Sequence, residues 1–205
     1  YRTKDGKLFS IETLEVMEYG DAKLNILPSS KRTPPAEKPA EEKASKKYLE
    51  GFNLNIRDNQ TNISYKGLFG DYLEGATEYV IKDPYIRLPY QMRNFVELCR
   101  LITELKPEDE EVRIHLVTFN SEEFLEAAKQ GFSELGDSLE ELGITFTYEF
   151  NDVQHDRCIE MNNGWKIILG RGLDIWQKTS GRFDIAEFYQ EKRLCKEFEV
   201  TVVRG

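Results

Sequence analysis

The chain has 205 residues, of which 40% are hydrophobic, so it can bury a core and one main domain is the default expectation. Its formal charge is −9; residues 1–47 carry 10 basic and 8 acidic side chains, which leaves 18 basic and 29 acidic, or −11, for the rest. This balance excludes a whole-domain basic footprint for nucleic acid or anionic lipid, so any anion site must be local.

The first part of the chain predicts no domain of its own. Residues 1–27 contain only short β-like pieces, too little to fold alone, and we expect them to be the tail of a preceding region. Residues 28–47 are rich in Pro, Lys and Glu, which is typical of a solvated linker. The folded domain is therefore expected over residues 48–205.

Within residues 48–205, hydrophobic periodicity predicts strands that alternate with helices. The helices are expected over residues 64–73, with Ser64 as N-cap, 91–105 and 121–142, the last with a capped start at Ser121. The strands are expected over residues 78–81, 112–119, 144–150, 158–161, 165–169 and 198–203. This order predicts an α/β fold with a mixed, largely parallel sheet flanked by helices.

Several classes of protein are excluded. The sequence shows no apolar leader and no apolar run near the ~20 residues that span a bilayer, so we expect a cytoplasmic piece of a longer protein. Its cysteines Cys99, Cys158 and Cys195 lie far apart without a Cys-x-x-Cys pair. We therefore predict no zinc site, no other metal and no cofactor.

The first candidate site segment follows the strand at residues 78–81. Asp83, Tyr85 and Arg87 lie on a proline-containing turn, and ligand sites of open α/β sheets gather beyond the carboxyl ends of strands. Arg87 could hold a phosphate or carboxylate bidentately. A turn set by proline, with an Arg on the surface, is an equally good interpretation.

A second candidate segment precedes the strand at residues 158–161. His155 suits proton transfer or nucleophilic attack, and Arg157 is a fixed cation two positions along, which on a strand lies on the same face. A His held by a structural hydrogen bond is the alternative. Asn162, Asn163 and the glycine after them are a turn signal, which predicts a β-hairpin.

The hairpin leads into a third candidate segment, Gly170-Arg171-Gly172. Two glycines permit close approach of the backbone to a ligand, and Arg171 lies between them; a loop with a solvent-facing Arg is the alternative. Asp174 completes the polar stretch. We expect the functional centre between His155 and Asp174.

Two long runs resemble a known family: KDPYIRLPYQMRNF at residues 82–95 and HDRCIEMNNGWKIILGRGLDIW at 155–176. They resemble the C-terminal domain of the MIT-domain-containing cytokinesis protein family, and the likeness extends from the LFGDYL helix at residues 68–73 to Cys195. The resemblance implies a phospholipase D-like fold with one half-motif per chain and a homodimer. In the eukaryotic member an MIT module binds ESCRT-III tails and the C-terminal domain binds acidic phospholipid. Bacterial members follow other domains, AAA+/Lon-like ones among them, so other domains of the same polypeptide are expected partners.

The resemblance permits a comparison with the phospholipase D pattern H-x-K-x-x-x-x-D. His155 matches the His, Arg157 replaces the Lys, and Asn162 stands in place of the Asp. Arg keeps the positive charge, whereas Asn cannot carry the negative one. Active members of the superfamily need two histidines, and this chain supplies one, because His115 lies in an apolar strand and is expected to be structural.

Three functions follow from this comparison. The favoured one is a non-catalytic dimeric targeting or assembly module, peripheral to a membrane, that binds an anionic lipid headgroup or other phosphate ligand. Its expected ligand-binding residues are Asp83, Tyr85, Arg87, His155, Arg157, Asn162, Asn163, Arg171 and Asp174. The alternative is a metal-independent phosphodiesterase or nuclease in which His155, with Arg157, pairs across a dimer; only then is nucleic acid an expected partner. The third is a structural domain that docks a larger ATPase or protease.

Overall fold

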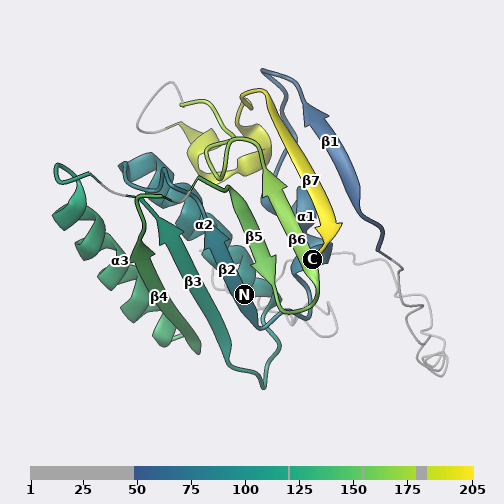
Figure 1. The fold of residues 1–205 in the computed structure, drawn as a ribbon. Helices are drawn as coiled ribbons and strands as arrows, with labels where there is room; N and C mark the ends of the chain where they lie inside the picture. Colours follow the sequence, from purple (N-terminus) through teal and green to yellow (C-terminus); the bar gives the residue numbers. More distant parts are fainter. Residues whose placement is uncertain (1–48, 120, 154, 179–183) are drawn as a thin grey trace, which may run out of the picture. The chain divides into compact units, whose positions relative to one another are not determined.

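The structure of the chain is a computed structural model that describes residues 49–119, 121–153, 155–178 and 184–205 (Figure 1). These residues belong to one compact unit, Tyr48–Gly205. The predicted tail over residues 1–27 and the predicted linker over 28–47 lie outside the described residues. Among the helices described, none combines the length and the apolar character needed to cross a bilayer.

The strands of the described chain form one seven-stranded sheet in the order β1-β7-β6-β5-β2-β3-β4 (Figure 1). Their bounds are Phe52–Ile56 (β1), Glu78–Lys82 (β2), Val112–Thr118 (β3), Ile144–Phe150 (β4), Cys158–Met161 (β5), Trp165–Leu169 (β6) and Phe198–Arg204 (β7). β3 is parallel to β2 and to β4, and the other neighbouring pairs are antiparallel. The predicted mixed α/β fold is confirmed, with its parallel part in β2, β3 and β4.

The connections explain this division of the sheet. β2, β3 and β4 are joined through helices, which is the connection that parallel neighbours require, whereas the tight turn after Met161 makes β6 return beside β5. Because β5 is antiparallel to β2, the residues before β5 lie at the carboxyl end of β2. The topology therefore brings His155 and Arg157 to the same edge as Asp83.

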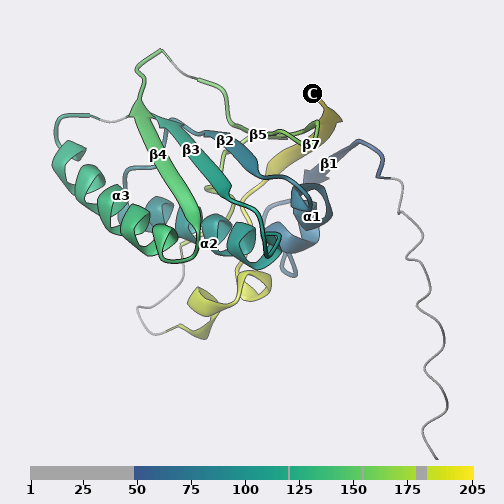
Figure 2. The ribbon, with the colours of Figure 1, turned by 90° about the horizontal axis from the view of Figure 1, so that it is seen from below.

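The three α-helices, α1 (Tyr65–Leu73), α2 (Pro89–Leu105) and α3 (Leu125–Glu140), cover one face of the sheet (Figure 2). Ser64 caps α1 as predicted, since its Oγ accepts a hydrogen bond from the backbone N–H of Gly67 at 3.2 Å. The predicted capped start at Ser121 is wrong. Residues 121–124 form a turn, closed by a bond from the N–H of Phe124 to the carbonyl of Ser121, and α3 begins after it.

The strands are amphipathic across the sheet. Tyr79 and Ile81 of β2 are buried toward the helices, whereas Lys82 is half-buried on the other face, where Glu160 accepts from both Lys82 and Lys166 at 2.8 Å. Lys166, followed by Lys82, lowers the pKa of Glu160. These two lysines are therefore neutralised within the sheet.

Two short 3₁₀ helices, η1 (Ile185–Phe188) and η2 (Gln190–Lys192), precede β7. Arg193 anchors them to α2, because its guanidinium donates to the carboxylate of Glu97 at 2.8 and 2.5 Å and to the carbonyl of Ala186 at 3.0 Å. The Arg193 side chain is only 5% exposed. Sequence periodicity predicted neither 3₁₀ helix.

Candidate anion-binding site

Asp83, the first residue after β2, ties two distant segments together. It is buried, and its carboxylate accepts hydrogen bonds from the backbone N–H of Tyr85 at 3.0 Å and of Leu173 at 2.8 Å. Burial raises the pKa of Asp83, while these two donors and the positive charge of Arg157 act in the opposite direction. One carboxylate therefore fixes the Asp83–Arg87 turn against the loop after β6.

Gly172 makes this junction possible. Its φ is +66°, and a Cβ at this position would lie 2.2 Å from Oδ2 of Asp83. The close approach that the sequence predicted for the glycine is therefore an approach to Asp83. The other side of the loop is held as well, because the carbonyl of Leu173 accepts from the Tyr65 hydroxyl at 2.8 Å and from Asn94 Nδ2 at 3.1 Å.

Arg157 is held over this junction. Its Nη1 donates to the carbonyl of Gly170 at 2.7 Å, and its Cζ lies 4.6 Å from the centroid of the Tyr85 ring. The Cζ of Arg87 lies 5.9 Å from the same centroid. Tyr85 is 41% exposed, so two guanidinium groups meet at one accessible aromatic ring.

Two further groups that can bear positive charge lie in the same segments. His155 is exposed two residues before Arg157, and Arg171 is exposed next to Gly170. Neither side chain forms a hydrogen bond or ion pair with another described residue, so both are open to a ligand.

Asp174 lies beside the cluster formed by Tyr85, Arg87 and Arg157, but it already has a partner. Its Oδ1 accepts from Lys196 Nζ at 2.7 Å, and both side chains are largely buried. The pair cancels one positive and one negative charge. The position of Asp174 therefore suits binding of Lys196 better than contact with an anion.

Asn162 lies at the opposite end of β5. Its Oδ1 accepts from the backbone N–H of Thr77 at 2.9 Å and of Glu78 at 3.2 Å, and its Nδ2 donates to the Thr77 hydroxyl at 2.8 Å. These bonds tie the hairpin to the start of β2, away from Asp83 at its end. The structure therefore keeps Asn162 out of the cluster.

Asn163 also serves the fold. Its Nδ2 donates to the carbonyls of Tyr72 and Glu74 at 2.9 and 3.1 Å, which satisfies acceptors at the end of α1. Of the nine residues predicted to bind a ligand, contacts join Asp83, Tyr85, Arg87 and Arg157 at one junction, Asp174 follows the junction residue Leu173, and His155 and Arg171 are exposed in the adjoining segments. The structure places the two asparagines elsewhere.

Several residues that build the site were not predicted. They are the backbone of Leu173 and the buried side chains of Tyr65 and Asn94, which act through hydrogen bonds that no sequence motif marks. Gly170 belongs to a predicted segment, but its hydrogen bond with Arg157 was not predicted. Lys196 was missed because its partner lies 22 residues away. No group of three or more His, Cys, Asp or Glu side chains in the described residues could hold a metal ion.

Comparison with known proteins places the chain among its relatives. Residues 62–204 match a family described as the phospholipase D-like domain at the C-terminus of MIT. The chain is also 36% identical over 164 residues to MIT domain-containing protein 1 of Mus musculus. That match covers 79% of this chain and 64% of the mouse protein, so the chain spans less than two thirds of this relative.

Proposed function

This chain belongs to the family of phospholipase D-like domains at the C-terminus of MIT, and we propose that its domain is a non-catalytic, dimeric module that binds a phosphate-bearing anion. The ligand is an acidic phospholipid headgroup or another phosphate group, and binding to lipid makes the module peripheral to a membrane. The domain then serves to target or assemble the longer protein of which it is part.

The meeting of Arg87 and Arg157 at the ring of Tyr85 carries this proposal. Two guanidinium groups lie near one exposed ring, and an anion bound by both would be stabilised by two positive charges and accept their hydrogen bonds. The carbonyl of Gly170 already orients Arg157, so the side chain loses less conformational entropy when it binds the anion.

The charge of the domain limits the kind of surface that it can bind. At −11 over residues 48–205, long-range attraction to an anionic membrane is absent, so binding depends on contacts made at the cluster. Nearby lysines do not enlarge the cluster, because Lys82 and Lys166 pair with Glu160 and Lys196 pairs with Asp174. We expect recognition of single headgroups and weak response to bulk surface charge.

The test compares Arg157→Ala with Arg100→Ala in flotation with phosphatidylcholine vesicles, with and without phosphoinositide. Arg100 is exposed on α2 and pairs with Glu104, so its loss changes the net charge equally without touching the cluster. Each lost charge-assisted bond is worth about 1.5–3 kcal/mol, so Arg157→Ala should weaken binding roughly tenfold or more.

Soluble inositol trisphosphate, added as a competitor, separates the two ligand sources. Release from the vesicles indicates that the phosphate group is what is recognised, whereas unaltered flotation indicates that the bilayer is required. Failure of the unmodified chain to float with phosphoinositide and to bind inositol trisphosphate would contradict the proposal, as would equal losses in both variants.

The second candidate function is the metal-independent phosphodiesterase. It is favoured by one observation: Asn162, which replaces the Asp of the phospholipase D pattern, binds the backbone at the start of β2. The replacement therefore removes no negative charge from the cluster. His155 is exposed, which leaves it accessible to the His155 of a second copy. In this candidate Arg157 stabilises the phosphate while the two histidines act as nucleophile and general acid.

Hydrolysis of bis-(4-nitrophenyl) phosphate separates the two candidates. We expect the unmodified chain, His155→Ala and Asn162→Asp to show the same background rate, because the domain holds its anion without cleaving it. A rate above background that His155→Ala abolishes would establish the phosphodiesterase. Asn162→Asp should leave the rate unchanged under either candidate, since its contacts lie at the other end of β5.

A further inference from the structure

The outer edge of β4 offers free backbone groups. β4 is the last strand of the sheet, and among the described residues it pairs with β3 alone. The N–H of Asn151 donates to the carbonyl of Thr118, so the odd-numbered residues of β4 direct their backbone groups toward β3. Because this direction alternates along a strand, the N–H and C=O groups of Phe146 and Tyr148 face outward.

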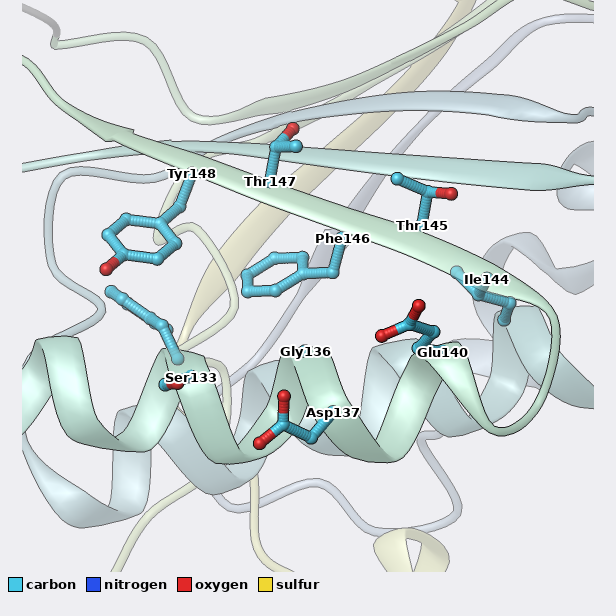
Figure 3. Close-up of a pocket in the computed structure, with 10 residues that line it drawn as sticks. Ser133, Gly136, Asp137, Glu140, Ile144, Thr145, Phe146, Thr147 and Tyr148 are labelled. Carbon is cyan, nitrogen blue, oxygen red and sulfur yellow. The ribbon is translucent and has the colours of Figure 1, made fainter.

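A groove of about 510 Å³ lies beside this edge, between β4 and α3 (Figure 3). The side chains of Phe146 and Tyr148 point from the strand toward the helix. Phe132 lies beneath, with its ring centroid 6.1 Å from that of Phe146 and 4.8 Å from that of Tyr148. The half-buried rings of Phe146 and Tyr148 and the buried ring of Phe132 thus line the groove beside the free edge.

Small residues on α3 keep the groove open. Ser133 and Gly136 line the groove on α3, and a Cβ on Gly136 would meet only the Phe146 ring, at 3.7 Å. A larger side chain at position 136 would extend into the space that the groove now occupies. Glycine is unfavourable in a helix interior by about 1 kcal/mol relative to alanine, so here it preserves space at a cost in stability.

The rim of the groove is acidic. Asp137 and Glu140 line its helix side, are exposed, and form no ion pair with another described residue, and the lining residues include no Lys or Arg. A second copy paired edge to edge would bring two acidic rims together, whereas a basic segment would be attracted.

We propose that this edge binds an extended peptide that turns both apolar and basic side chains, at every second position, toward α3. The peptide adds an eighth strand by pairing with the outward backbone groups of Phe146 and Tyr148. Because every second side chain of a strand lies on the same face, its apolar side chains enter the groove over Phe132 and Gly136 while basic side chains further along that face meet Asp137 and Glu140. This site operates independently of the proposed anion site.

Selection of random peptides displayed on phage against the full chain tests the proposal. We expect enrichment of sequences in which every second position carries an apolar residue or a Lys or Arg, and one selected peptide, labelled with fluorescein, then serves as the probe in anisotropy titrations. Gly136→Leu fills the groove, and Asp137→Lys with Glu140→Lys reverses the rim. Each should weaken binding roughly tenfold or more.

The matched control reverses two other acidic residues of α3, Glu126→Lys with Glu134→Lys, which do not line the groove. It changes the net charge equally and should leave the affinity unchanged. Thermal unfolding followed by circular dichroism verifies that each variant is folded. Absence of an enriched pattern, or equal weakening in the control, would overturn the proposal. So would a change in sedimentation of the rim variant without peptide binding, because the edge would then belong to a second copy.

Discussion

Replacing Gly172 with alanine is expected to destabilise the domain by about 3–5 kcal/mol. About 1–2 kcal/mol comes from placing a residue with a Cβ at a φ of +66°. The remainder follows because a Cβ 2.2 Å from Asp83 Oδ2 must displace a buried carboxylate from its two backbone donors, at about 1–3 kcal/mol for each unsatisfied group. Urea unfolding measures the loss.

Gly75→Ala is the matched control for this substitution. Gly75 has a φ of +73°, and a Cβ added there would have no atom within 4 Å, so its replacement should cost only the conformational term. A double-mutant cycle with Asp83→Ala isolates the contact, since Gly172→Ala should then cost no more than Gly75→Ala. Equal losses for Gly172→Ala and Gly75→Ala in the unmodified background would show that Asp83 does not depend on this approach.

Replacing Arg193 with methionine is expected to cost about 3–5 kcal/mol, because it leaves the carboxylate of Glu97 without its buried cation. The backbone carbonyl of Ala186 also loses a donor, and the Trp176 ring loses a guanidinium whose Cζ lies 5.1 Å from its centroid. The 3₁₀ helices should detach from α2 first. For a domain of this size the loss corresponds to a fall in Tm of roughly 10 °C, measurable by calorimetry.

Two variants determine whether the ion pair is responsible. Arg100→Met removes an exposed partner of Glu104 on the same helix and should cost less than about 1 kcal/mol. Adding Glu97→Met to Arg193→Met should restore part of the lost stability, because it removes the unpaired charge. If Arg193→Met proved as mild as Arg100→Met, the anchoring of η1 and η2 to α2 by this pair would be refuted.

The sequence predicted the elements whose patterns are strong. α2 and β2 to β7 were expected close to their observed bounds, since each carries helical or strand periodicity punctuated by proline or glycine. β1 was missed although FNLNI alternates apolar and polar residues, because the strand is short and asparagine is depleted in strands. It is stabilised by pairing with β7, where Phe52 lies opposite Val202.

The site was predictable in part for a similar reason. The sequence predicted that Arg157 precedes a β-hairpin and that Asp83 follows a strand, but only the antiparallel pairing of β5 with β2 in the structure brings the two residues to the same end of the sheet. The inclusion of Asn162 ignored the length of β5: six residues lie between it and His155, and seven steps of extended chain span roughly 20 Å. Two residues of a sequence pattern that lie before and after a strand are close in sequence, but the extended strand holds them far apart in space.

Binding of a phosphate-bearing anion by Arg87 and Arg157 at the ring of Tyr85 is tested most directly by a titration of the full chain with inositol trisphosphate. The titration is followed by the Nε–Hε signals of the arginine side chains in NMR spectra. We predict saturable shifts of Arg87 and Arg157 and unchanged signals for Arg100 and Arg113, which pair with Glu104 and Glu78 far from the cluster. Unchanged signals for Arg87 and Arg157, or equal shifts for all four, would contradict the claim.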